Sequence, residues 1–257
     1  MGSNMLHVLQ VCPEFPFRGG VERHVLEVSR CLRDRGVQVT VLASNPRGRL
    51  PGHEYHENIE VIRFGCWSPG DSYYFTPSVF LHLARITTPC TIVHSHSYQA
   101  LPSFAAALAK VCNHLPLVFT PHFHPMGGSK FRSILKRLYR PFGKLVFDLS
   151  DVVIALSEHE RSTLKVMFHL DSDKIRVVPH GIHHLCQRLR EPSTNILYVG
   201  RLEKYKGVDF LIECLPEVLQ HLPRATLTIV GTGPDEGRLR RIVNERGLLS
   251  SVKFLGG

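Results

Sequence analysis

Short apolar runs alternate with helix-patterned runs along this chain, and this alternation constrains its fold more than any other feature. The alternation begins at residue 6, stops at the polar segment 187–194 and restarts at residue 196. Continuous apolar strands separated by helices are typical of parallel sheets that are covered by helices. We therefore predict an α/β protein with two Rossmann-like domains, at residues 5–190 and 191–257.

The individual elements follow from the same pattern. Strands are expected at residues 6–11, 37–43, 59–64, 90–96, 115–122, 151–157, 174–181, 196–200, 225–231 and 251–256. Helices are expected at residues 21–36, 77–86, 100–112, from about Lys130, and at 158–168, 208–221 and 235–247. Three strands and two helices would leave a sheet face and an edge bare in the second domain, so we expect that domain to be incomplete.

The net charge of +9 is concentrated in one third of the chain. Between Asp71 and Asp148 there are eight Lys and Arg residues and no Asp or Glu. A local field of one sign favours anionic partners such as phosphates or acidic lipids. Nucleic acid is not expected as a partner, because the basic residues come without an aromatic RNA-binding motif or a helix-turn-helix pattern.

The seven Cys residues are an odd number without a CxxC pair, which favours buried thiols in a reducing compartment over a disulfide framework. No signal-like segment opens the chain and no run reaches the ~18 apolar residues of a spanning helix. We expect a cytoplasmic protein. Peripheral attachment to the inner face of the membrane is compatible with this location. Met1 to Asn4 are set aside as residues unrelated to the fold.

Two strand-to-helix turns carry candidate anion sites. Gly19 and Gly20 open a helix, where free N–H groups and the helix dipole can receive a phosphate. A flexible loop before a helix is an equal alternative for these glycines. Arg201 and Lys206 lie in a turn bounded by glycines, where a guanidinium fork and an ammonium can clamp a diphosphate. The alternative for this pair is two solvated surface cations.

Histidines follow two of the expected strands. His122 lies before a proline-rich turn and is a candidate for hydrogen bonding to a substrate, with a structural role equally open. The pairs His94/His96 and His122/His124 could hold a divalent metal in a hydrolase. Residues 72–147 contain no carboxylate, however, so we expect no metal.

The basic segment that begins at Lys130 has two interpretations. Its apolar residues fall at helical spacing: Phe131, Ile134, Leu135, Leu138 and Phe142. Its cations lie mostly elsewhere on the helix: Lys130, Arg132, Lys136, Arg137 and Arg140. A core-facing stripe with a solvated basic face is favoured. The alternative is an interfacial helix that docks on anionic lipid or an anionic acceptor.

Several motifs, taken in order, resemble those of GT-B-fold, family-4-type glycosyltransferases. They are GGVERHVLEVSRCLRDRGVQVTVLA, IVHSHS, VFTPHFH, ALSEHERSTL, VVPHGIH, ILYVGRLEKYKGVDFLI, LTIVGTGPDEGRL and VKFLG. The resemblance covers nearly the whole chain. It implies transfer of a sugar from a UDP- or GDP-linked donor to an acceptor hydroxyl, with retention of configuration and without a metal or other cofactor.

The resemblance also implies roles for the candidate residues. Gly19 and Gly20 would lie against the donor diphosphate, Arg201 and Lys206 would clamp it, and His122 would contact the donor sugar near the reacting carbon. No carboxylate nucleophile is implied. The implied mechanism is substitution on one face of the sugar, with the leaving phosphate oxygen taking the proton of an acceptor glycan or lipid.

Two departures from the family pattern stand out. His180 and His183 occupy positions where the family's turn has Asn and Asp. The chain also ends before a family segment with two Glu residues that holds the donor sugar and ribose, so we expect a fragment whose activity is open. A metal-dependent hydrolase and a non-catalytic module that binds anionic membranes remain as alternatives.

Overall fold

The computed structural model shows two compact units, residues 1–183 and 184–257, and each is described by itself. The structure describes residues 5–16, 19–46, 48–68, 74–86, 90–123, 130–181 and 193–257, with the backbone alone for 130–137. The expected boundary between residues 190 and 191 and most of the expected linker lie outside these ranges.

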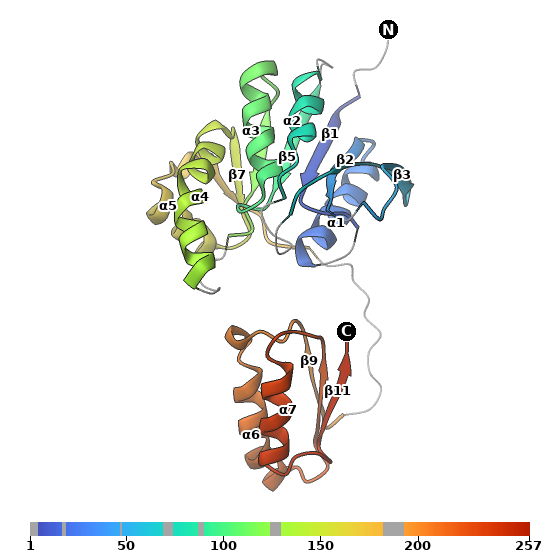
Figure 1. Ribbon diagram of the computed structural model, residues 1–257, viewed down its shortest axis with the longest axis vertical. Helices are drawn as coiled ribbons and strands as arrows, with labels where there is room; N and C mark the ends of the chain where they lie inside the picture. The colour runs from blue at the N-terminus through green and yellow to red at the C-terminus, as the bar shows by residue number, and fades with distance from the viewer. Residues whose placement is uncertain are drawn as a thin grey trace. The chain divides into compact units, whose positions relative to one another are not determined.

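The first unit is built on an eight-stranded sheet with the order β3-β4-β2-β1-β5-β6-β7-β8 (Figure 1). Its strands are β1 (His7–Cys12), β2 (Gln38–Asn45), β3 (His53–His56), β4 (Ile59–Gly65), β5 (Thr91–His96), β6 (Leu117–Thr120), β7 (Val152–Ala155) and β8 (Ile175–Val177). Every neighbouring pair is parallel except β3 with β4, which is antiparallel. The chain builds outward from β1 in one direction and from β5 in the other, so β1/β5 is the topological switch point.

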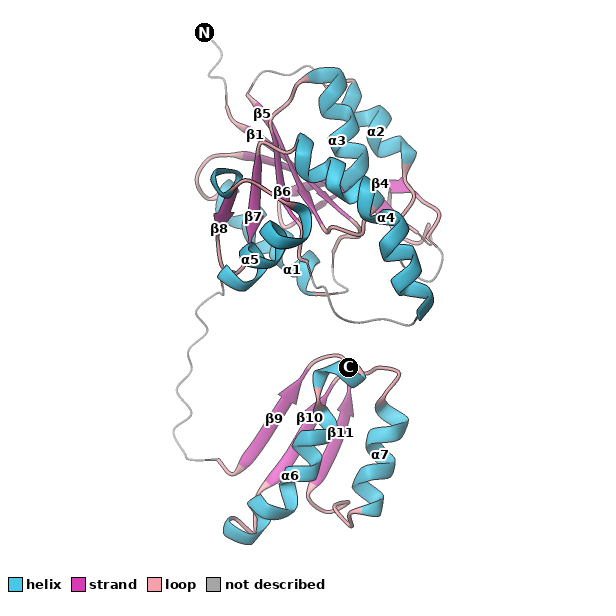
Figure 2. Cartoon of the chain, turned by 90° about the vertical axis from the view of Figure 1, so that its left-hand side faces the viewer, coloured by secondary structure: helices cyan, strands magenta, loops and turns pink. Residues whose placement is uncertain are grey.

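Helices cover both faces of this sheet. They are α1 (Gly20–Arg33), α2 (Pro77–Ala84), α3 (Leu101–Asn113), α4 (Lys130–Leu149) and α5 (Glu158–Phe168), with a short 3-10 helix at Ser172–Lys174. One core contains residues of α2 to α5 together with Leu9 and Val11 of β1. A second core joins α1 to the other side of the sheet, and it includes Cys12 of β1. This division follows from the alternation of side chains along a strand. Helices α2 and α3 lie side by side (Figures 1 and 2).

The second unit is a three-stranded parallel sheet with the order β11-β10-β9 (Figure 2). Its elements are β9 (Asn195–Val199), a 3-10 helix at Lys204–Lys206, α6 (Val208–His221), β10 (Thr226–Val230), α7 (Glu236–Glu245) and β11 (Val252–Gly256). Apolar residues of α6 and α7 pack with the sheet in one core. Leu197, Val199 and Leu255 are exposed, in agreement with the expectation that this unit leaves apolar sheet surface uncovered.

These observations confirm the predicted α/β class with two Rossmann-like parallel sheets. The predicted strands omit one strand of the described residues. Residues 53–56 form the antiparallel edge strand β3. Their sequence, His-Glu-Tyr-His, has no apolar alternation to reveal a strand. In the described part of the chain, no helix combines the length and the apolar character that a membrane span requires.

The expected core-facing stripe of α4 is wrong for its second half. Leu138 and Phe142 are 64% and 49% exposed, whereas Tyr139, Val146 and Phe147 are buried. Gly143 explains the shift, because a Cβ there would run into the ring of Tyr98. The helix therefore turns its glycine side toward the core. The other residues of the expected stripe, Phe131, Ile134 and Leu135, have side chains outside the described ones.

We expect Gly231→Ala to destabilise the second unit by about 2 kcal/mol or more. Gly231 follows β10 with a φ of +141°, and a Cβ there would collide with the carbonyl oxygen of Gly200. Gly237→Ala is the matched control, since a Cβ on this residue of α7 has no atom within 4 Å. Urea unfolding of both variants measures the difference. Equal free energies of unfolding in the two variants would show that the close approach of Gly231 to Gly200 does not constrain the residue at position 231.

Candidate functional site

Polar side chains occupy the sheet where β1 meets β5. Gln10 of β1 pairs in register with His94 of β5, and both are buried. Because side chains alternate along a strand, His96 points to the same face as His94. The Nε2 of His96 donates to Oε1 of Gln10 at 2.7 Å, and the Nε2 of His94 lies 2.8 Å from Oγ1 of Thr120. The switch point, where α/β sheets bind ligands, is thus lined by imidazoles on the face that α1 covers.

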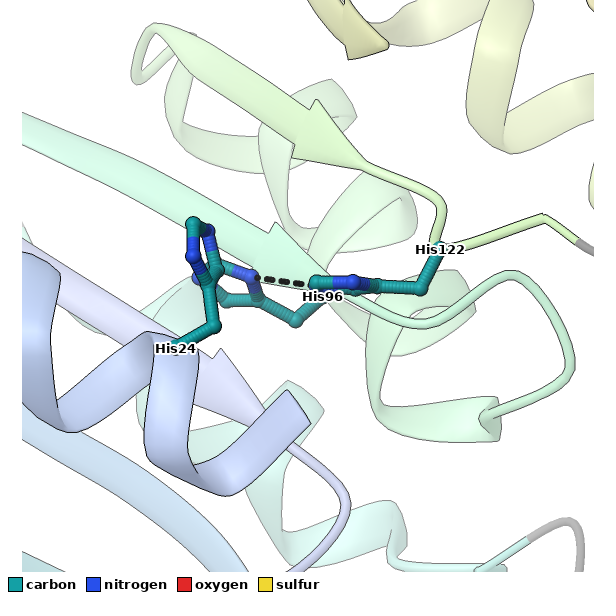
Figure 3. Close-up of side chains that lie close together, drawn as sticks. All are labelled: His24, His96 and His122. Atoms are coloured by element: carbon teal, nitrogen blue, oxygen red, sulfur yellow. Dashed lines mark hydrogen bonds between the residues drawn. The ribbon is translucent and has the colours of Figure 1, made fainter. Parts of the chain in front are cut away.

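Three further elements bring imidazoles to the same place. His24 comes from α1, His122 follows β6, and His180 follows β8. Figure 3 shows the rings of His24, His96 and His122 close together, from the helix α1, the end of β5 and the loop after β6. One ring nitrogen from each of these three lies within 4.8 Å of the others. The two closest contacts are His96 Nδ1 to His122 Nε2 at 3.4 Å and His180 Nδ1 to His24 Nδ1 at 2.8 Å.

Burial keeps the rings of His24, His94 and His96 uncharged at neutral pH. It lowers the pKa of His24 to about 4, with a further contribution from the neighbouring His180. Burial likewise lowers the pKa of His94 to about 3 and holds that of His96 well below its usual range. A neutral imidazole has one N–H donor and one lone pair. His24, His94 and His96 therefore contribute donors and acceptors without contributing charge.

The loop that carries His122 is fixed by a buried carboxylate. Glu160 is 7% exposed, and its two oxygens accept from the backbone N–H groups of Phe123 at 2.6 Å and Leu156 at 2.7 Å. Its own N–H donates to Oγ of Ser157, the N-cap of α5. His122 itself has a φ of +47°, in the left-handed region that non-glycine residues adopt infrequently. Glu160 thus positions an unusual backbone beside the cluster.

The alternative grouping of the histidines in two HxH pairs is not seen for the first pair. His94 and His96 lie within β5 rather than after it, and His94 bonds to Thr120. His124 lies outside the described residues. The cluster instead takes His96 and His122 and adds His24 and His180. His24 carries no local signal in the sequence, whereas His180 was marked as a departure from a family motif.

The predicted glycine site lies at the N-terminus of α1. Gly19 is the N-cap and Gly20 the first helical residue, and no side chain caps this end. Gly19 has an extended backbone, so its conformation does not require glycine. A Cβ at Gly20 would have no atom within 4 Å, which leaves room for a ligand. Glu22 in the first turn already places a negative charge there, and a phosphate would have to compete with it.

The predicted cationic pair lies in the second unit, on the turn after β9. Arg201 has a side chain that is 76% exposed and forms an ion pair with Glu203 at 3.1 Å. Lys206 ends the 3-10 helix, and its Nζ lies 5.1 Å from the centre of the Tyr205 ring. Gly207 has a φ of +68° and begins α6. Both cations are available to a ligand at the carboxyl edge of this sheet.

Of the five predicted basic residues of α4, only Arg140 has a described side chain. It is exposed and donates to the backbone oxygen of Met167, near the C-terminus of α5, at 2.8 Å. This contact satisfies a carbonyl of the last helical turn, so Arg140 has a structural role. The side chains of Lys130, Arg132, Lys136 and Arg137 lie outside the described ones, and their role as an anionic-acceptor or membrane face stays a prediction.

An apolar cavity of about 560 Å³ opens among α2, α3 and α4. Its lining is almost entirely apolar: Phe75, Thr76, Pro77, Phe80, Leu101, Phe104, Ala105, Leu108, Leu138, Tyr139 and Phe142. Leu138 and Phe142, which the sequence pattern assigned to the core, line this cavity while remaining exposed. The cavity lies on the sheet face opposite α1, and Leu101 begins the helix that follows β5. Sequence reasoning missed it.

Comparison with known proteins gives the class of the molecule. The family model Glycosyltransferase Family 4 matches residues 18–184, and Glycosyl transferases group 1 matches residues 187–257. A phosphatidylinositol N-acetylglucosaminyltransferase subunit of Arabidopsis thaliana is 26% identical over 259 residues, 94% of this chain and 55% of that protein. A GDP-mannose-dependent alpha-(1-6)-phosphatidylinositol monomannoside mannosyltransferase of Mycobacterium tuberculosis is also 26% identical, over 98% of this chain and 68% of its own length.

A solved structure is similar over both units. Anabaena Alr3699/HepE in complex with UDP-glucose matches with a TM-score of 0.71 and 18% identity, covering 98% of this chain and 69% of that one. This likeness confirms the GT-B class of fold. The chain spans about half the length of the plant relative. The first model covers more than half of the chain, and the second covers most of the remainder. The chain therefore belongs to Glycosyltransferase Family 4, and its C-terminal segment is of the Glycosyl transferases group 1 type.

Proposed function

We propose that the protein transfers a sugar from a UDP- or GDP-linked donor to a lipid-linked acceptor. The observation that carries the proposal is the cationic turn of Arg201 and Lys206, which lies in the segment matched by the Glycosyl transferases group 1 model. Two relatives are named for a phosphatidylinositol-type acceptor, and one for a GDP-mannose donor. A structural neighbour contains UDP-glucose.

The donor diphosphate is assigned to the two candidate anion sites. Arg201 offers a fork of N–H donors and Lys206 a compact charge, and both would stabilise the negative charge that grows on the leaving diphosphate. The open space above Gly20 and the free N–H groups of the first turn of α1 support a phosphate contact there. With two cations in place, the transfer requires no metal ion or other cofactor.

The reacting sugar is assigned to His122. Its imidazole follows β6 beside the ring of His96 and can form hydrogen bonds to a sugar hydroxyl. Glu160, the carboxylate that contacts its loop at Phe123, already accepts from two backbone N–H groups. A double displacement through Glu160 would break these bonds. We therefore favour substitution on one face of the sugar, in which the leaving phosphate oxygen accepts the proton of the acceptor hydroxyl and configuration is retained.

The acceptor is assigned to the apolar cavity and the helix beside it. A cavity of about 560 Å³ lined by aromatic and aliphatic side chains suits an acyl or prenyl chain. Helix α4, which supplies Leu138 and Phe142 to the lining, begins with a run of Lys and Arg that would attract anionic lipid headgroups. This arrangement supports a peripheral position at the cytoplasmic face of a membrane.

Arg201→Ala and Lys206→Ala should each weaken binding of UDP or GDP by about ten- to a hundredfold, because each removes a charge-assisted contact to the diphosphate. Calorimetric titration in EDTA measures the affinity and also tests metal independence. Arg224→Ala is the matched control. Arg224 is exposed and precedes β10, so it lies at the amino ends of the strands, whereas Arg201 follows the carboxyl end of β9. Unchanged affinity in both variants would refute the clamp and favour a non-catalytic module.

Glu160→Gln should lower kcat by about ten- to a hundredfold, because an amide cannot accept from two backbone N–H groups and the loop of His122 shifts. Glu158→Gln is the control, as Glu158 is exposed on the same helical turn. The product should keep the donor's anomeric configuration, as read by NMR. Rescue of Glu160→Ala by azide with an inverted glycosyl azide product would instead identify Glu160 as a nucleophile.

The cavity can be tested with the chain's single tryptophan. Trp67 exchanges two backbone hydrogen bonds with Phe75, which lines the cavity, so its fluorescence reports on a chain that enters. A phospholipid with brominated acyl chains, used as monomers below its micelle concentration, should quench Trp67. Ala105→Phe should reduce this quenching about tenfold, because the new ring fills the cavity.

Val111→Phe is the control for the quenching experiment. Val111 is 57% exposed on the same helix and does not line the cavity, so its variant should be quenched like the parent. Quenching that is equal in Ala105→Phe, with the fold of that variant verified by its thermal transition, would place the lipid chain elsewhere.

A further inference from the structure

Three imidazoles from three elements converge at the carboxyl edge of the first sheet, and a fourth, from the segment after β8, lies beside them. They belong to His24, His96, His122 and His180. The ring of His24 lies 5.2 Å from that of His122, 5.7 Å from that of His96 and 4.4 Å from that of His180, measured between centres. The rings of His122 and His180 are stacked, with centres 5.7 Å apart. The described residues thus gather more imidazole here than a single hydrogen bond to a sugar requires.

The spacing of the nitrogens matches a common metal ligand sphere. Zinc binds imidazole nitrogens at about 2.0–2.1 Å, so two nitrogens on one tetrahedral ion lie about 3.3 Å apart. His96 Nδ1 and His122 Nε2 are 3.4 Å apart, which is long for a hydrogen bond but fits two ligands of one ion. The remaining nitrogens of the three-residue group lie within 4.8 Å, a gap that small rotations of the rings would close.

One ligand is already oriented by a second residue. The Oε1 of Gln10 is an acceptor only, so the Nε2 of His96 that lies 2.7 Å from it carries the proton. This leaves the lone pair of His96 on Nδ1, the atom that faces His122. Buried hydrogen bonds of this kind hold the histidine ligands of metal sites in the required tautomer.

We propose that His24, His96 and His122 form a site for a borderline transition-metal ion such as Zn²⁺, and that His180 becomes the fourth ligand when its ring turns away from its present 2.8 Å contact with His24. The ligand set contains only nitrogen, which excludes Mg²⁺ and Ca²⁺ and suits zinc, cobalt, nickel or copper. His180 is exposed, so the ion reaches the buried ligands from that side. An ion held there occupies the lone pair with which His122 is proposed to contact the sugar, and it therefore inhibits transfer.

The test is a titration of the untagged chain with CoCl₂ and ZnCl₂. Exposed thiols are first alkylated with iodoacetamide, because Cys31, Cys90, Cys112 and Cys214 would otherwise bind metal. Co²⁺ should show the intense visible absorption of a tetrahedral nitrogen site at one ion per chain, and Zn²⁺ should displace it. This readout needs no sugar transfer, so its failure leaves the proposed function intact.

His180→Asn is the decisive variant. It restores the residue of the family motif at an exposed position, so the fold is retained, and it should weaken zinc binding at least tenfold and abolish the tetrahedral spectrum. His114→Asn is the control, since His114 is exposed at the C-cap of α3 and asparagine also tolerates its left-handed backbone. Absence of saturable cobalt binding, or equal zinc affinity in His180→Asn and the parent chain, would overturn the site.

Discussion

The parallel pairing of β1 with β5 determines where the chemistry of this protein lies. It joins the two halves of the first sheet, and its register sets Gln10 beside His94. Because side chains alternate along a strand, Leu9 and Val11 lie in the core formed with α2 to α5, whereas Gln10 and His94 lie on the sheet face covered by α1. A shift of one residue in this register would exchange the two sets, burying imidazoles in the larger core.

The site depends on parts that hold one another in place. Gln10 orients His96, Glu160 fixes the loop after His122, and Ser157 anchors the helix that carries Glu160. Each of these hydrogen bonds involves at least one residue that is not itself proposed to contact a ligand. The cationic turn of the second unit is different, since Arg201 is exposed and forms an ion pair with Glu203. The first unit thus offers side chains fixed by buried hydrogen bonds, and the second offers exposed cations.

Much of the fold could be predicted from the sequence because strands and helices leave periodic patterns. The order of strands and helices and the cations after β9 could be read in this way. The strand β3 could not, because its His-Glu-Tyr-His sequence has no apolar period. The exposure of Leu138 and Phe142 could not either, because it follows from the contact of Gly143 with Tyr98, two residues far apart in the chain. The histidine cluster joins residues separated by up to 156 positions, and no local spacing reveals it.

The ends of the larger sheet have a consequence for how copies of this chain meet. Its outermost strands are β3, with four residues, and β8, with three. An edge strand presents unpaired N–H and C=O groups that can recruit a strand from another molecule, and the tendency grows with its length. Two short edges, one of them carrying His53, Glu54 and His56, offer little for such pairing. The short edges of the eight-stranded sheet therefore limit edge-to-edge aggregation between copies of the chain.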